Sequence, residues 1–226
     1  VRNINFRKAI FHALNRSEIV KDFPEMSPSY ELLPHHFWGR VGLKDPYDLP
    51  EAKKYILKVP KDLLKDELSV PAFAGKVFTA NQQKRLDRIK SQLAEIGIKL
   101  KVYPTQDKFT EKSQAESSPM KFSGKVADLV DPLIIFSAYR GNSPYLYSRP
   151  IKIDEYESKF QAAAKVIAKE ERVKSIRELS EFMNTESMVV PILEDRMVIY
   201  FQKNRIKTLG YQPQPVTLLI QNIEMY

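Results

Sequence analysis

The sequence predicts a mixed fold, an α/β arrangement with α+β character. Helical periodicity alternates with short β-rich runs along the 226 residues, and residues 76–103 change from strand-like to helical periodicity and back. The composition, 43% hydrophobic and 28% charged, is that of an ordinary globular protein. A chain of this length can bury a large core without disulfides, so we expect one large domain or two small ones.

The N-terminal part is expected to hold three helices and one long loop. Residues 3–15 place apolar side chains on one helical stripe, and Asn15 with Glu18 predicts a capping-box start for a short helix that ends near residue 23. Prolines at positions 24, 28 and 34 then exclude regular structure from a long loop. A third helix is expected over residues 50–58, with proline in its first turn.

Residues 76–103 form the clearest supersecondary unit. Residues 76–80 are typical of a strand, residues 81–96 of an amphipathic helix that ends at Gly97, and residues 98–103 of a second strand. A strand, a helix and a strand in this order predict two parallel strands joined by a right-handed crossover.

The C-terminal half should continue the mixed pattern. We expect helices over residues 105–115, 156–167 and 173–186, and a short strand over residues 122–127. Two β-rich runs, 188–193 and 197–201, are separated by three charged residues, which predicts a hairpin-like connection. The apolar run 216–220 is expected to dock either on the chain's own sheet or on a missing second lobe.

No motif indicates catalysis, a metal or a cofactor. The chain has no cysteine and three histidines, for which we expect structural or solvent roles. Seven scattered glycines form no phosphate-binding loop, and no nucleophile elbow or zinc-protease motif occurs. Asp128 and Asp131 could serve as acid and base only if burial separated their pKa values. We therefore expect a protein that is not an enzyme.

The net charge of +8 and the pI near 9.4 raise the question of a nucleic-acid partner. Lysine and arginine are interleaved with acidic residues, and no nucleic-acid-binding motif accompanies them. We therefore expect a solvated basic surface and no nucleic acid. The sequence also lacks a run of 18 apolar residues, so nothing in it should span a bilayer.

Several segments, in order, resemble the C-terminal lobe of the family 5 extracellular solute-binding proteins, the dipeptide-, oligopeptide- and nickel-binding receptors of ABC importers. The segments are NFRKAIFHALNRSEIV at 5–20, LPHHFWG at 33–39, LPEAKKYIL at 49–57, IKSQLAEIGIKLKV at 89–102, GKVADLVDP at 124–132, Glu171-Arg172 with the following helix, VVPI at 189–192 and IKTLG at 206–210. Each segment alone is weak evidence for the family. Together the segments cover nearly the whole chain in the correct order, and this combination is specific.

This resemblance implies one lobe of a periplasmic-binding-protein type II fold, similar to domain 3 of dipeptide-binding proteins, spanning residues 1–226. The preceding lobe, and any leader or lipid anchor, would lie outside the chain. It also implies a periplasmic or membrane-anchored extracytoplasmic location. The partners would be a peptide or other small solute, the membrane subunits of an ABC importer and the missing N-terminal lobe.

The resemblance also implies a ligand-binding position at Asp128, because the aspartate of this motif pairs with the ligand's α-amino group in peptide-binding members. A desolvated ammonium needs such a charge-assisted acceptor. The alternative for Asp128 is a cap of the loop before Pro132. Two positions depart from the family pattern: Lys125 replaces the usual tryptophan, and Gln106 stands where an aromatic residue is common. Both thin the aromatic walls of the site, which leaves an ordinary peptide ligand in doubt.

Other candidates come from residue type and place. Lys84, with Arg85, lies at the start of the helix over 81–96, where a carboxylate could be received, although an exposed basic helix face explains them as well. Trp38 lies in the long loop, and exposed aromatic residues on loops suit either ligand stacking or packing. Tyr139, Tyr145 and Tyr147 follow the Asp128 motif and carry the same alternatives.

Two other functions stay open at this stage. The same lobe could be the ligand-sensing domain of a transcriptional regulator with a DNA-binding domain upstream, or a scaffold with a vestigial cleft. The sequence that precedes Val1 would separate these alternatives.

Overall fold

The computed structural model describes residues 3–105, 120–124, 131–141, 152–196, 200–210 and 220–226. The predicted helix over 105–115 lies almost wholly outside these residues. Of the predicted strand over 122–127, only residues 122–124 are described. Within the described residues, helices and strands are mixed as expected.

Three helices open the chain, close to where the sequence predicts them: α1 (Ile4–Ala13), α2 (Arg16–Val20) and α3 (Leu49–Ile56). The Asn15 side chain caps α2 by accepting from the Glu18 N–H at 3.0 Å. The reciprocal half of the predicted capping box is wrong, because the Asn15 N–H donates to the side-chain oxygen of Gln92 at 2.9 Å. This hydrogen bond connects the N-terminus of α2 to the helix that contains Gln92.

The strand, helix and strand unit is confirmed, with a corrected first strand. Strands β2 (Leu68–Phe73) and β3 (Leu100–Thr105) are parallel and in register from Leu68–Leu100 to Phe73–Thr105, and α4 (Ala80–Ala94) connects them. The prediction of a strand at 76–80 is wrong. Gly75 turns the chain there with φ of +89°, and Thr79 caps α4 in a capping box with Gln82.

A short antiparallel ribbon joins the loop to the C-terminal half. It pairs β1 (Met26–Pro28) with β4 (Leu193–Asp195). The predicted loop therefore contains one short strand. Pro28 is the last residue of this strand, where the pairing with β4 requires no backbone N–H from it. The predicted hairpin of 188–193 with 197–201 is wrong in its pairing: β4 pairs with β1, residues 188–192 form no strand, and residues 197–199 lie outside the described part.

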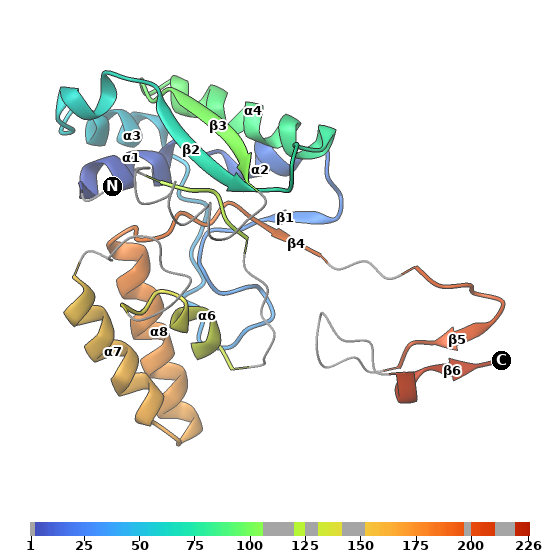
Figure 1. The fold of residues 1–226 in the computed structure, drawn as a ribbon. Helices are drawn as coiled ribbons and strands as arrows, with labels where there is room; N and C mark the ends of the chain where they lie inside the picture. The colour runs from blue at the N-terminus through green and yellow to red at the C-terminus, as the bar shows by residue number, and fades with distance from the viewer. Residues whose placement is uncertain (1–2, 106–119, 125–130, 142–151, 197–199, 211–219) are drawn as a thin grey trace.

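The other helices of the described residues are α6 (Leu133–Ser137), α7 (Ile153–Lys165) and α8 (Lys169–Thr185), besides two 3-10 turns, Lys61–Leu64 and Ile220–Asn222. Figure 1 shows α6, α7 and α8 on one side of the β1–β4 ribbon and α1 to α4 on the other. Each group has its own apolar core. The first is built around Phe6, Ile10, Leu14, Ile19, Val70, Ile89, Leu93 and Ile98, and the second around Leu33, Phe37, Phe136, Tyr156, Ile176, Leu179 and Met183.

The C-terminal residues form an arm that projects from this body in Figure 1. The arm contains β5 (Ile206–Thr208) and β6 (Glu224–Met225), which pair antiparallel. Several of its apolar side chains are exposed: Tyr200 is 90% exposed, Ile220 76% and Tyr226 79%. The predicted apolar tail strand at 216–220 lies outside the described residues except for Ile220.

Candidate functional site

The predicted ligand-binding segments leave the fold at one edge of the parallel strands. Phe122 pairs parallel with Ala72 of β2, so β3, β2 and residue 122 run in the same direction side by side. Gln106 follows Thr105, the last residue of β3, and Lys125 comes three residues after Phe122. In open α/β sheets, ligands bind beyond the carboxyl ends of the strands. The described residues that precede both segments, Thr105 and Phe122, therefore lie at or beside this edge.

Thr105 connects β3 to the end of β2 at this edge through its backbone carbonyl and its hydroxyl. It is only 5% exposed, and its carbonyl accepts from the N–H groups of Ala74 and Gly75, each at 3.3 Å. Its hydroxyl donates to the carbonyl of Ala72 at 3.3 Å. These bonds hold the turn after β2 against the end of β3, and α4 begins from that turn.

Asp128 and Lys125 lie outside the described residues, as does Gln106, but the chain is held on both sides of residues 125–130. On one side, the Phe122 N–H donates to the Pro71 carbonyl at 2.9 Å. On the other, Asp131 accepts from the Leu133 N–H at 2.9 Å and from Arg172 of α8 at 2.6 Å. Asp131 thus accepts from the first residue of α6 and forms an ion pair with Arg172 of α8, which is a structural role.

Lys84 lies in the second turn of α4 and forms an ion pair with Asp22 at 2.7 Å. Arg88, one turn further along, also pairs with Asp22 and donates to the carbonyls of Glu18 and Ile19. Hydrogen bonds from Lys84 and then Arg88 lower the pKa of Asp22 to about 2. The ammonium of Lys84 therefore has a carboxylate partner, and it joins α2 to α4.

Trp38 is 36% exposed, and its loop is held in place by contacts with α8. The next residue, Gly39, has φ of +81°, and a Cβ atom there would lie 2.4 Å from Cγ2 of Ile176 on α8. Arg177 of the same helix donates to the Arg40 carbonyl at 3.1 Å. The loop thus presents Trp38 from a rigid support, which suits either packing or ligand stacking.

A buried carboxylate that no sequence motif marks holds the same loop. The side chain of Glu31 is fully buried and accepts from Arg40 at 3.0 Å and from the N–H groups of Val41 and Gly42 at 2.8 and 3.0 Å. Next to it, Glu194 of β4 accepts from the His35 N–H at 3.0 Å. This network ties the loop to the ribbon from which the C-terminal arm departs.

Two arginines of the opening segment are structural, and sequence reasoning did not assign them this role. Arg16 is 0% exposed and donates to the carbonyls of Pro191 at 2.7 Å, Leu14 at 2.9 Å and Phe11 at 3.1 Å. Burial lowers its pKa to about 10, against the opposing influence of Asp45 and Tyr30. Arg7 donates twice to the Glu186 carbonyl, at 3.0 and 2.7 Å. Both arginines bind the first helices to the segment that follows α8.

Two of the three histidines have ordinary polar partners, and the ring of the third, His36, lies 4.6 Å from that of Phe37. A ring nitrogen of His12 lies 2.8 Å from the Pro46 carbonyl, and that of His35 lies 2.8 Å from a carboxylate oxygen of Glu194. Within the described part of the chain, no group of three or more histidine or acidic side chains could hold a metal ion. Its helices include none that is long and apolar enough to cross a membrane.

Several solved structures share the fold of this chain. CtaP of Listeria monocytogenes, an ABC transporter substrate-binding protein, is 19% identical with a TM-score of 0.76, and the match covers 98% of this chain and 47% of that one. DppA of Helicobacter pylori, an ABC transporter-associated periplasmic binding protein in complex with the peptide STSA, is 20% identical with a TM-score of 0.73, covering 99% and 44%. NikA of Brucella suis, in complex with Fe(III)-EDTA, is 11% identical with a TM-score of 0.72, covering 99% and 48%.

These likenesses identify a periplasmic-binding-protein type II fold, and the chain spans about half the length of CtaP, DppA and NikA. Residues 1–146 match the family described as bacterial extracellular solute-binding proteins, family 5 middle. The chain therefore belongs to this family, whose members bind solutes and are not enzymes. A comparison with curated protein sequences gave no match.

Proposed function

We propose that the chain is one lobe of the solute-binding component of an ABC importer, and that it closes on a peptide or other small solute together with a preceding lobe. The observation that carries this proposal is the family match over residues 1–146. The match is to extracellular binding proteins, so it offers no support for the regulator alternative. The protein would work outside the cytoplasmic membrane and deliver its solute to the importer's membrane subunits.

The exposed arm supports a preceding lobe as a partner. A two-stranded ribbon is marginally stable by itself, and the apolar side chains of β5, β6 and their flanks have no core in the described residues to join. The chain also covers less than half of CtaP, DppA and NikA. The arm would bury these side chains against the preceding lobe.

Asp128 is the proposed anchor for a positively charged group of the ligand, with Lys125, Gln106, Lys84 and Trp38 as further cleft residues. The anchors on either side of residues 125–130 support this assignment, because Phe122 is fixed beside β2 and Asp131 is fixed to Arg172 of α8. Lys84 could reach a ligand only by exchanging Asp22 for the ligand's own carboxylate.

Calorimetry on the longer, two-lobed protein tests the anchor, using a peptide found in a thermal-shift screen of di- to pentapeptides. Loss of a buried charged partner costs about 2–5 kcal/mol, so Asp128→Asn should weaken binding roughly 30-fold to several thousand-fold. The matched control is Asp154→Asn, an exposed aspartate of α7, which should leave binding unchanged. Equal affinities of the two variants would reduce Asp128 to a loop cap.

We also propose that this chain has no hydrolase or transferase activity. In the described part of the chain no nucleophile, base and oxyanion donors converge, and Asp131, the carboxylate nearest the proposed anchor in sequence, is committed to Arg172. A broad esterase, peptidase and phosphatase screen should show no turnover. Turnover that a single substitution abolished would contradict the proposal.

A further inference from the structure

A buried ion pair holds the loop that carries Trp38. The side chain of Glu31 is 0% exposed, and its two oxygens accept from the N–H groups of Val41 and Gly42 at 2.8 and 3.0 Å. Arg40 completes the set, with Nη2 2.8 Å from Oε1 of the same carboxylate. Desolvation of both charges opposes their attraction, so the single conformation that the pair imposes on the loop explains it better than a gain in stability does.

Three further contacts hold the same loop close to its tryptophan. Phe37 is 6% exposed in the second core. Gly39 packs against Ile176 of α8, where no room is left for a Cβ atom. The N–H and the ring of His35 both contact one carboxylate oxygen of Glu194 in β4, at 3.0 and 2.8 Å. The loop is therefore fixed from the core, from α8 and from the β1–β4 ribbon.

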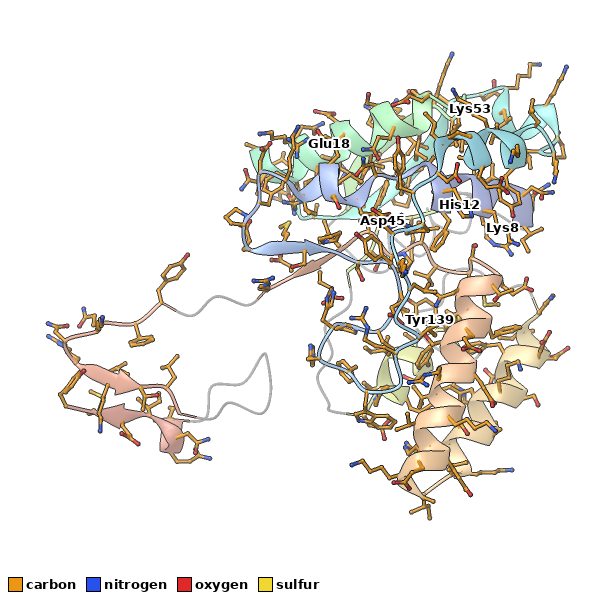
Figure 2. All side chains as sticks on the ribbon, turned by 180° about the vertical axis from the view of Figure 1, so that it is seen from behind. Lys8, His12, Glu18, Asp45, Lys53 and Tyr139 are labelled. Atoms are coloured by element: carbon orange, nitrogen blue, oxygen red, sulfur yellow. The ribbon has the colours of Figure 1, made fainter. Side chains whose placement is uncertain are left out.

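One large side chain of this fixed loop remains accessible. Trp38 is the only tryptophan of the chain and is 36% exposed, although Phe37 and Gly39 on either side of it are buried. In the view of Figure 1 the loop lies between α8 and the arm, and Figure 2 shows the same order from behind, with Asp45 marking the later part of the loop. Under the proposed function the arm packs on the preceding lobe, so this side of the body would face that lobe.

We propose that Trp38 contacts the solute through its indole ring, and that Glu31 is the positioning residue that orients it. The inference rests on the proposed function and adds a solute class, namely solutes that carry an apolar or aromatic group. An indole provides a large contact area with few torsions to order. Because the loop is already fixed, binding does not have to order it, which favours affinity.

Fluorescence of the 226-residue chain tests the positioning role without a ligand. Trp38 is the only tryptophan, so its emission and its quenching by acrylamide report on this loop alone. Glu31→Gln leaves Arg40 without its charged partner, so the emission should shift to longer wavelength and quenching should increase. The matched control is Glu186→Gln, which alters another buried, ion-paired carboxylate at the C-terminal end of α8 and should leave both readings unchanged.

A double-mutant cycle on the longer, two-lobed protein tests whether Glu31 acts through Trp38. The probes are phenylalanine-containing peptides from the screen, compared with the same peptides carrying alanine in place of phenylalanine. Trp38→Ala should weaken binding of the phenylalanine peptides about 10-fold and that of the alanine peptides less. Glu31→Gln should weaken binding when Trp38 is present and have no further effect in the Trp38→Ala background, because the side chain that it orients is gone.

The outcomes separate this inference from the proposed function. If the longer protein binds no peptide, the proposed function and the solute contact of Trp38 fall together, and the fluorescence comparison alone decides the role of Glu31. If peptides bind but Trp38→Ala has no effect, or Glu31→Gln weakens binding equally in both backgrounds, the inference is overturned and the proposed function stands. Equal fluorescence changes in Glu31→Gln and Glu186→Gln would also overturn the positioning role.

A milder variant keeps the test valid if circular dichroism shows that Glu31→Gln does not fold. Arg177→Gln removes an exposed side chain that donates to the Arg40 carbonyl at 3.1 Å and leaves the buried ion pair intact. It should loosen the same loop, and its effect on peptide binding should likewise disappear in the Trp38→Ala background. An effect that persists there would contradict the inference.

Discussion

Several arginine side chains in this fold form hydrogen bonds that connect elements distant in sequence. Arg16, Arg7 and Arg172 each donate to backbone carbonyls at the end of a helix or in the segment after α8, where peptide oxygens lack partners. A guanidinium can satisfy two or three such oxygens at once, which a lysine cannot do. Replacement of these arginines should therefore affect stability before it affects any ligand.

Asp22 provides a pH-dependent test at this scale. Its pKa is lowered to about 2 by hydrogen bonds from Lys84 and Arg88, so the pair stabilises the fold above the ordinary aspartate pKa of about 3.9, and this contribution is lost as the pH falls toward 2. A carboxyl NMR titration should find this pKa in the folded chain. Lys84→Ala should raise it part of the way to the ordinary value, because Arg88 remains.

Lys90 on the same helix is half-buried and has no ion pair within the described residues, so Lys90→Ala serves as the control and should leave the Asp22 titration unchanged. If Lys84→Ala has no more effect than this control, the ion pair that fixes Lys84 at the α2–α4 contact does not form in solution.

At the scale of elements, the contact between the long loop and α8 depends on one glycine. Gly39→Ala combines a positive φ with a Cβ atom 2.4 Å from Ile176, whereas Gly75→Ala has a similar φ of +89° and nothing within 4 Å. The left-handed conformation alone costs about 1–2 kcal/mol, and overpacking adds about 1–3 kcal/mol. Urea denaturation should show Gly39→Ala as the more destabilising change. Equal losses would mean that the loop moves away from α8 at little cost.

Sequence reasoning located elements with strong local signals and misplaced those that depend on partners. The helices α1, α4, α7 and α8 carry apolar stripes and were predicted within a few residues. Residues 76–80 have β-forming side chains, but Gly75 and the Thr79 cap determine their structure. Strands β1 and β4 are three residues each and exist only as a pair, so neither has a periodicity of its own to detect. Glu31 and Arg16 were missed as buried anchors because burial of a charge depends on the tertiary fold.

For the whole molecule, two cores meet along buried arginine contacts, and an exposed apolar arm extends from the ribbon between them (Figure 1). Such an arrangement is expected of a piece that is completed by another folded unit. Under the proposed function, the edge formed by β2, β3 and Phe122 would be one wall of a cleft, so a ligand held by this wall alone would lose the contacts of the opposite one while its ordering cost stayed the same.

The central claim, that this chain is one wall of a two-lobed solute receptor, is tested most directly by calorimetry on two proteins. The peptide selected in the screen is titrated into the longer protein and into the isolated 226-residue chain under the same conditions. The account predicts saturable binding by the longer protein and at least roughly 100-fold weaker binding by the isolated chain, which corresponds to about 3 kcal/mol of lost contacts. Equal affinities of the two proteins would contradict it, because the preceding lobe would then contribute nothing to the site.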